Sequence, residues 1–224
     1  MGYTFIMGKS ERIPIDLLVF DFDGTLADSI PPAVEAIQAM LAELGYPSRS
    51  KEEIDRHVGY GENPLVAGSI GTNDPEKVEA AKKVYFKHYV EKLKHIDLYP
   101  HVEETIRHFK NKTRIIVSNK RDEFIRIILD HHGLTSEFKE ILGGDSAPCL
   151  KPDPCVIEQL KKKYKVPPER ILFVGDMTVD VETGKNAGVR TCAVTYGMHD
   201  RKKLEAHCPD FLIEDLSQLK NLML

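Results

Sequence analysis

The sequence predicts an α/β protein in which a Rossmann-like, doubly wound parallel sheet carries a small all-helical domain inserted after its first strand. From residue 98 onward, apolar runs alternate strictly with segments of helical periodicity, which is typical of parallel sheets with helical crossovers. One earlier apolar run, residues 17–20, is continuous, as expected for a strand buried on both faces. The stretch between them has helix and turn patterns but no convincing strand. We therefore expect an α/β core at residues 1–28 and 98–224 and a helical cap at residues 29–97.

The cap is expected to begin with a helix that follows the first strand. Ser29 precedes two prolines and apolar residues at helical spacing, which is typical of a helix N-terminus, and Gly45 is a suitable stop. Asp28 and Ser29 are therefore interpreted as structural residues that cap this helix. Further cap helices are expected near Lys51, after the turn-rich segment 59–64, and from Pro75 toward Lys94.

The second half of the chain is expected to supply the remaining strands and their connecting helices. The strands are expected at residues 114–118, 138–144, 170–176, 189–197 and 210–215. The helices are expected at residues 100–111, 122–133, 152–164, 178–188 and 216–224. Because ligands of open α/β sheets bind beyond the carboxyl ends of the strands, the residues that follow the strands are the first candidates for a site.

Composition and charge exclude several classes of protein. The formal net charge of −4, with 29% charged residues, argues against nucleic acid or an anionic membrane as the main partner. No apolar run approaches the roughly 20 residues of a transmembrane helix. Residues 1–14 lack the features of a signal peptide and are expected to form a loose arm. We expect a cytoplasmic monomer or homodimer that acts on a small molecule.

The cysteines show no C-x-x-C spacing and no paired framework; they are Cys149, Cys155, Cys192 and Cys208. Cysteines in such a pattern are typically reduced in a cytosolic protein. The sequence therefore predicts free thiols at all of these positions.

The stretch VFDFDGTLADS, residues 19–29, places two aspartates directly after the first strand. Residues two apart on an extended chain project to the same side, so the Asp21 and Asp23 carboxylates are expected to face one place. Like charges this close need a cation or a shared proton. Two other strand ends carry polar residues, Ser118–Asn119 and Gly175–Asp176, and we expect all of them at one rim, covered by the cap.

A second pair of acids follows a later strand. Asp176 ends that strand and Asp180 lies four residues on, which puts both carboxylates on one face at a helix N-terminus. A helix cap with an acid in the first turn would explain this pair equally well. Together with Asp21 and Asp23, however, the rim would hold four carboxylates and no His or Cys. Such ligands suit Mg²⁺ rather than zinc.

Donor groups are expected on the other side of the rim. The segment VSNK supplies the Ser118 hydroxyl, the Asn119 side chain and the backbone N–H groups of a turn, which together can cradle an oxyanion. The segment CLKPDP places Lys151 in a turn, where its ammonium can neutralise a phosphate or a carboxylate. Acids with a metal on one side and donors on the other are what phosphoryl transfer requires.

Four segments, DFDGTLADS, VSNK, KPDP and VGDMTVD, resemble the signature motifs of haloacid dehalogenase superfamily phosphatases, in the same order. The resemblance covers the chain from Ile15 to its end, and the insertion corresponds to the superfamily's helical cap. HVGYGENPLV and VSNK further resemble phosphoglycolate phosphatase-like members, more weakly than the core motifs. The resemblance implies a Mg²⁺-dependent phosphatase for a small phosphate monoester, with 2-phosphoglycolate as the leading substrate. Pyrophosphate, sugar phosphates and nucleoside monophosphates stay open.

The matching positions imply different roles for the aspartates. Asp21 would attack phosphorus and form an aspartyl-phosphate, and Asp23 would protonate the leaving oxygen and then activate water. Mg²⁺ would be held by the Asp21 side chain, the Asp23 backbone carbonyl and Asp176, with Asp180 orienting the ligands. The residues implied in phosphoryl binding are Gly24, Thr25, Ser118, Asn119 and Lys151. Lys151 would also balance charge.

In the cap, the loop from Arg56 to Asn63 is the candidate for substrate contact. Gly59 and Gly61 would let its backbone approach a ligand, although an ordinary turn between helices would look the same. Asp23 argues against a dehalogenase or a phosphonoacetaldehyde hydrolase, because those members lack an aspartate at this position. A phosphomutase keeps both aspartates and stays open, as does a non-catalytic phosphate-binding module.

Overall fold

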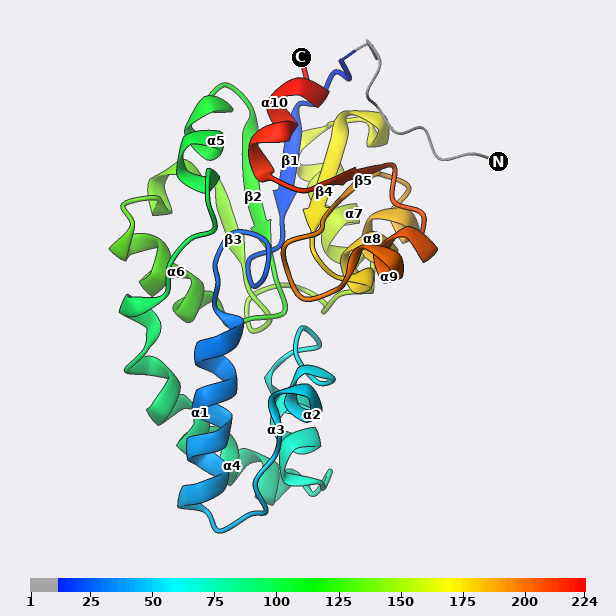
Figure 1. Cartoon of the computed structure of the whole chain (residues 1–224). Helices are drawn as coiled ribbons and strands as arrows, with labels where there is room; N and C mark the ends of the chain where they lie inside the picture. The colour runs from blue at the N-terminus through cyan, green and yellow to red at the C-terminus, as the bar shows by residue number, and fades with distance from the viewer. Residues whose placement is uncertain (1–11) are drawn as a thin grey trace.

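The computed structural model describes residues 12–224 (Figure 1). Most of the segment expected as a loose arm, residues 1–11, lies outside the described residues. The chain that follows is tied to the C-terminus, because the Ile13 N–H donates to the Leu222 carbonyl over 2.9 Å and the Ile13 carbonyl accepts from the Leu224 N–H over 3.0 Å. Within the described part of the chain, no helix has the length and apolar character that crossing a membrane requires.

Six strands among the described residues form one parallel sheet in the order β3-β2-β1-β4-β5-β6. They are β1 (Leu17–Phe20), β2 (Thr113–Val117), β3 (Glu140–Leu142), β4 (Ile171–Gly175), β5 (Arg190–Val194) and β6 (Phe211–Ile213). The first strand lies in the middle, where Val19 pairs with Ile115 of β2 on one side and with Phe173 of β4 on the other. The predicted Rossmann-like α/β core is confirmed.

Helices cover both faces of this sheet (Figure 1). They are α5 (Val102–His108), α6 (Asp122–His131), α7 (Cys155–Tyr164), α8 (Thr178–Asn186), α9 (Arg201–Ala206) and α10 (Leu219–Leu222). Because side chains alternate along a strand, Leu18 and Phe20 pack in the cluster with α5, α6 and α10, whereas Leu17 and Val19 pack in the cluster with α7. All of β1 is buried, which explains its continuous apolar run.

The insertion forms a helical layer beyond the carboxyl ends of the strands (Figure 1). Its elements are α1 (Ile30–Glu43), α2 (Lys51–Asp55), α3 (Glu62–Ile70), α4 (Pro75–Val90) and the 3-10 turn η1 (Leu93–His95). Helix α4 packs against both α1 and α3. It begins at Pro75, as predicted, because the Asp74 carboxylate caps it by accepting from the Glu76 N–H over 3.0 Å.

The chain leaves the sheet and returns to it along two adjacent segments. Ala27 and Leu98 form an isolated antiparallel bridge, and the Asp28 N–H donates to the Asp97 carbonyl over 2.9 Å. We propose that the cap begins and ends at this pair of crossings, with boundaries after residues 28 and 97.

Helix α1 departs from expectation at its N-terminus. Ser29 occupies the N-cap position, but its side chain makes no capping hydrogen bond. The Ser29 hydroxyl instead donates to Asp23 Oδ1, while the Asp28 carboxylate accepts from the Tyr99 hydroxyl over 3.3 Å. The expectation of a capping role for Ser29 is therefore wrong, because Pro31 and Pro32, the second and third residues of the helix, have no N–H from which its hydroxyl could accept.

The sequence pattern also misses helix α9. The Asp200 carboxylate caps it by accepting from the Lys203 N–H over 2.8 Å, yet Leu204 is its one buried residue. A helix with a single buried apolar residue has no periodicity to detect. Residues 216–224, expected as one helix, form a 3-10 turn η4 (Leu216–Gln218) followed by the short α10.

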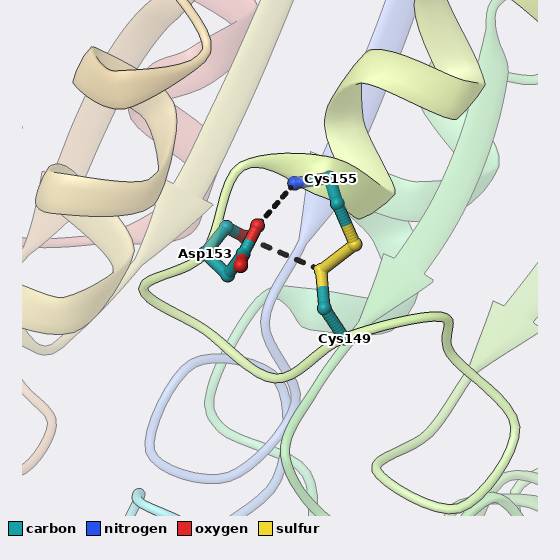
Figure 2. A group of neighbouring side chains, drawn as sticks. All are labelled: Cys149, Asp153 and Cys155. Atoms are coloured by element: carbon teal, nitrogen blue, oxygen red, sulfur yellow. Dashed lines mark hydrogen bonds between the residues drawn. A yellow bond between two sulfur atoms is a disulfide. The ribbon is translucent and has the colours of Figure 1, made fainter.

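Cys149 and Cys155 form a disulfide, with their Cα atoms 6.2 Å apart (Figure 2). The expectation of free thiols is wrong for this pair, while the other two cysteines keep their thiols. The turn between the pair brings them together: the Asp153 carboxylate accepts from the Cys155 N–H over 2.9 Å and folds the chain back at the start of α7. The closed loop contains Lys151.

Candidate active site

The predicted polar residues converge at the carboxyl ends of the central strands. Asp21 follows β1, Ser118 follows β2 and Asp176 follows β4, which are neighbours in the sheet. The Asp21 N–H donates to the Val174 carbonyl over 2.8 Å, so the ladder between β1 and β4 extends to the aspartate itself. The sheet therefore places the Asp21 backbone rigidly at this rim.

Four charged residues of the core form a buried group that we call the core cluster: Asp21, Lys151, Asp176 and Asp180. The Lys151 ammonium lies 2.7 Å from Asp21 Oδ1 and 2.6 Å from Asp180 Oδ1. Asp180 Oδ2 accepts from the Met177 N–H over 2.9 Å. Lys151 thus joins the nucleophile candidate on β1 to the start of α8.

Asp176 is held from two sides. Its Oδ1 accepts from the Thr25 hydroxyl over 2.9 Å, and its Oδ2 accepts from the Met198 N–H over 2.7 Å. Gly24 passes so close that a Cβ there would lie 2.2 Å from Asp176 Oδ2, and its φ of +76° is one that glycine adopts without strain. Thr25 and Gly24 therefore place the Asp176 carboxylate against the turn that follows Asp21.

Burial raises the pKa of two acids in the core cluster, Asp21 and Asp176. The pKa of Asp21 is raised to about 6, mainly by burial, although Lys151 opposes the shift. Burial, and then the charges of Asp180 and Asp21, raise the pKa of Asp176 well above its ordinary value. For Lys151, burial lowers the pKa, but the two adjacent carboxylates outweigh burial and raise it overall. The cluster holds more negative charge than its lysine neutralises.

The core cluster fits a hard divalent cation. Asp21, Asp176 and Asp180 can each offer an oxygen, and these oxygens lie within 4.8 Å of one another. Three carboxylates against one ammonium leave an excess of negative charge in a buried place, which a divalent cation would neutralise. Oxygen ligands without His or Cys suit Mg²⁺.

Asp23 belongs to a second group, which we call the cap-facing cluster: Asp23, Ser29, Lys120 and Tyr89. The Lys120 ammonium lies 2.9 Å from Asp23 Oδ1 and donates to the Tyr89 hydroxyl over 2.6 Å. It also lies 4.5 Å from the centre of the Tyr89 ring. Tyr89 is on cap helix α4, whereas Lys120 and Asp23 belong to the core, so this cluster exists only where the cap meets the core.

Sequence reasoning misses Lys120 and Tyr89 as site residues. Lys120 lies within the quoted segment VSNK, directly after Ser118 and Asn119, and its position at a strand end is the signal that could have found it. Tyr89 has no such signal, because a tyrosine inside an amphipathic helix looks like any other core residue.

The Asn119 side chain serves as a brace between loops. Its amide nitrogen donates to the Gly59 carbonyl over 2.9 Å and to the Lys151 carbonyl over 3.1 Å. Its oxygen accepts from the Lys151 N–H over 2.9 Å. Both amide hydrogens are used, so the predicted contact of this side chain with phosphate is not available while the cap is docked, and Asn119 positions Lys151 instead.

A cavity of about 50 Å³ lies between the two clusters and the cap. Gly59 and Gly61 line it, as predicted for the cap loop. A Cβ at Gly59 would lie 2.3 Å from the Met177 sulfur, which explains a glycine there. Arg56 and Asn63 are exposed outside the lining, and Asn63 Oδ1 accepts from Lys82 over 3.0 Å. These two side chains lie outside the cavity lining, and their contact with a substrate stays a prediction.

Glu62 is a lining residue that the sequence does not single out. One of its oxygens, Oε1, is buried without a hydrogen-bond partner, and the nearest cation, Arg121, lies 3.9 Å from Oε2. Burial raises the pKa of Glu62 to about 7. The negative charge of its carboxylate therefore faces the cavity with little positive charge in contact with it.

Comparison with known proteins decides the family. The family model of haloacid dehalogenase-like hydrolases matches residues 18–194. The chain belongs to this family. It is 34% identical over 215 residues to a phosphoglycolate phosphatase of Vibrio parahaemolyticus, which covers 92% of this chain and 94% of the relative. It is 35% identical over 216 residues to phosphoglycolate phosphatase 1 of Pseudomonas aeruginosa, which covers 93% of this chain and 79% of the relative.

Solved structures of the family share the fold. A predicted phosphoglycolate phosphatase from Haemophilus somnus superposes with a TM-score of 0.87 at 28% identity, over 93% of this chain and 97% of the other. A putative haloacid dehalogenase-like hydrolase from Bacteroides fragilis superposes with a TM-score of 0.85 at 30% identity, over 92% and 99%. At this coverage the likeness includes the cap as well as the core. The predicted family and the hydrolase class are confirmed.

Proposed function

We propose that this protein is a Mg²⁺-dependent phosphatase that hydrolyses a small phosphate monoester through an aspartyl-phosphate on Asp21, with 2-phosphoglycolate as the leading substrate. The observation that carries the proposal is that Asp21 and Asp23 line one cavity with different partners. Asp21 belongs to the core cluster with Lys151, whereas Asp23 is held by Ser29 and Lys120. Two carboxyl groups in different surroundings suit two different roles.

In the first step, a carboxylate oxygen of Asp21 forms a bond to phosphorus as the bond to the ester oxygen breaks. Asp23 gives its proton to that ester oxygen, which leaves as an alcohol. The Lys151 ammonium, 2.7 Å from Asp21 Oδ1, offsets the charge that the phosphoryl group brings. At neutral pH a group with a pKa of about 6 is mostly ionised, so Asp21 is available as a nucleophile.

In the second step, Asp23 acts as a base. It takes a proton from a water molecule that attacks phosphorus, and the Asp21 carboxylate is released together with inorganic phosphate. The Ser29 hydroxyl and the Lys120 ammonium keep the Asp23 carboxyl oriented through both steps. The cap closes over the cavity and limits entry of bulk water, which favours small substrates over macromolecules.

The remaining residues hold the phosphoryl group and the metal. The Ser118 hydroxyl and the backbone around Gly24 are the donors proposed for the phosphoryl oxygens, and Thr25 holds Asp176 in place. Asp21, Asp176, Asp180 and the Asp23 backbone carbonyl would hold Mg²⁺. When bound, the metal withdraws charge from the phosphoryl oxygens and screens the carboxylates.

Release of inorganic phosphate from a panel of esters tests the proposal. The panel contains 2-phosphoglycolate, pyrophosphate, a sugar phosphate and a nucleoside monophosphate, ranked by kcat/KM with Mg²⁺ and after removal of divalent metal. We expect the Asp21→Asn variant to lose at least about 10³-fold in kcat, because the amide is a poor nucleophile. We expect a similar loss on chelation.

The outcomes separate the alternatives. Turnover retained by Asp21→Asn would contradict the nucleophile, and turnover retained without metal would contradict the Mg²⁺ site. Binding of phosphate without any turnover would point to the non-catalytic module. An isomerised phosphate ester in place of free phosphate would point to a mutase.

A further inference from the structure

The leaving-group side of the cavity offers one positive charge. Among the described residues that line the cavity, Lys120 and Lys151 are the cations. Lys151 lies between Asp21 and Asp180 and is committed to the core cluster. Lys120 instead lies 2.9 Å from Asp23 Oδ1, beside the group that protonates the leaving oxygen in the proposed function.

Lys120 retains the capacity to bind an anion. An ammonium has three N–H donors, and the described contacts, to Asp23 and to the Tyr89 hydroxyl, use two of them. Its side chain is 6% exposed, so a contact with a ligand anion would form away from bulk water. Charge-assisted hydrogen bonds are strongest in such a place.

The surroundings of Lys120 limit where that anion can lie. The other lining residues near Lys120 are largely apolar or aromatic, namely Ile30, Ala33, Val58, Leu65 and Tyr85 of the cap and Phe124 of α6. Glu62 also lines the cavity, and its carboxylate, with Arg121 3.9 Å from Oε2 and Oε1 without a hydrogen-bond partner, disfavours an anion beside it. Because Lys120 contacts Asp23, the group that protonates the ester oxygen in the proposed function, a negatively charged substituent is accommodated close to that oxygen and disfavoured beside Glu62.

We infer that Lys120 determines specificity by binding a carboxylate that the leaving alcohol carries on its ester carbon. This inference rests on the proposed function and identifies the residue that recognises the carboxylate of its leading substrate. Tyr89 is a positioning residue, because its hydroxyl and ring hold the Lys120 ammonium. Since Tyr89 lies on α4, the carboxylate site is complete only when the cap is docked.

The test compares two esters of the same skeleton, 2-phosphoglycolate and 2-hydroxyethyl phosphate, in which a neutral CH₂OH replaces the carboxylate. Wild-type protein is expected to prefer 2-phosphoglycolate in kcat/KM by at least about 50-fold. This ratio corresponds to the free energy that a hydrogen bond to a charged group contributes. In Lys120→Met this preference is expected to fall to within about 5-fold, with most of the loss in KM for 2-phosphoglycolate. Lys120→Arg is expected to keep part of the preference, because it keeps the charge.

The ratio of the two esters distinguishes recognition from a structural role. If Lys120 only orients Asp23, Lys120→Met slows both esters equally and the ratio stays unchanged, which overturns the inference. Lys92→Met, on the exposed face of the cap, is the matched control and is expected to change neither rate. Should Lys120→Met fail to fold, inhibition of wild-type and Lys120→Arg protein is measured with glycolate and with ethylene glycol as the neutral comparison. We expect glycolate to inhibit and ethylene glycol not to inhibit. Equal inhibition by the two compounds would overturn the inference.

Failure of the inference differs from failure of the proposed function. Wild-type protein that hydrolyses 2-hydroxyethyl phosphate as well as 2-phosphoglycolate would overturn the role of Lys120 and leave the phosphatase proposal standing. Absence of phosphate release from every ester would overturn both.

Discussion

Lys151 and Lys120 line the same cavity and are both almost fully buried, but their partners come from different parts of the molecule. The partners of Lys151 are Asp21 and Asp180, which both belong to the core. The partners of Lys120 are Asp23 of the core and Tyr89 of the cap. The core cluster can therefore form without the cap, whereas the cap-facing cluster needs the two domains together. The core cluster is therefore suited to chemistry that is common to all substrates. The cap-facing cluster is suited to recognition of one leaving group.

The electrostatics of the two sites differ in the same way. In the core cluster three carboxylates surround one ammonium, and their repulsion suits the binding of a cation. In the cap-facing cluster a single carboxylate, a hydroxyl and an aromatic ring surround the ammonium, which leaves it capacity for an anion.

The largest expected effect is that of Lys151→Met. Removal of this ammonium leaves Asp21 and Asp180 buried without a counter-charge, and we expect kcat to fall by about 10³-fold on every ester. Phosphate release from 2-phosphoglycolate and 2-hydroxyethyl phosphate measures it. Equal losses on both esters would separate Lys151 from Lys120. A change in the preference between esters would remove the distinction between the two lysines.

Gly24→Ala tests how tightly the core cluster is built. The new Cβ would lie 2.2 Å from Asp176 Oδ2, so we expect a loss of about 10²-fold in kcat and a higher Mg²⁺ requirement. Gly45→Ala is the matched control, because Gly45 has a similar positive φ with nothing within 4 Å of the added Cβ. Both variants are expected to lose about 1–2 kcal/mol of stability from the backbone strain. Equal activity in the two would show that the approach to Asp176 is unimportant.

Glu62→Gln tests the uncompensated charge on the cap side. The pKa of Glu62, raised to about 7 by burial, means that the wild-type protein is most stable below the ordinary pKa of 4.5 and loses stability as the pH rises through about 7. We compare the free energy of unfolding of the variant with that of the wild type at each pH. We expect this difference to favour the variant by about 2–3 kcal/mol more at pH 8 than at pH 5. Urea unfolding at the two pH values measures it. Glu91→Gln, at an exposed position of the cap, is the matched control.

The smallest effect concerns the disulfide around Lys151. Reduction of Cys149–Cys155 opens a short loop, and loop-closure entropy predicts a loss of about 2 kcal/mol in free energy of unfolding. Activity is expected to change little, because Asn119 and two carboxylates still hold Lys151. Unfolding with and without a reductant measures the loss, and the Cys149→Ser, Cys155→Ser double variant should reproduce it. Four titratable thiols in the unreduced, denatured protein would contradict the disulfide.

The parallel sheet and the convergence of the aspartates could be predicted from the sequence. β1 is apolar throughout because both faces of a central parallel strand are buried, and that pattern is local. Asp21, Ser118 and Asp176 could be expected together, since the carboxyl ends of parallel strands share one edge. Helix α4 could be placed because its cap and first turn, Asp74 and Pro75, are adjacent in the chain.

Other contacts were decided only by the tertiary structure. The Ser29 hydroxyl turns from its helix to Asp23, and the Asn119 amide joins Gly59 of the cap to Lys151 of the core. Lys120 donates to the Tyr89 hydroxyl, 31 residues away in the sequence, and no pattern along the chain predicts this contact. The sequence by itself determined which groups stand at the strand ends, because strand geometry is periodic and local. Which of those groups face the cavity and which brace the cap depended on how the cap docks on the core, since docking joins side chains that no short segment contains.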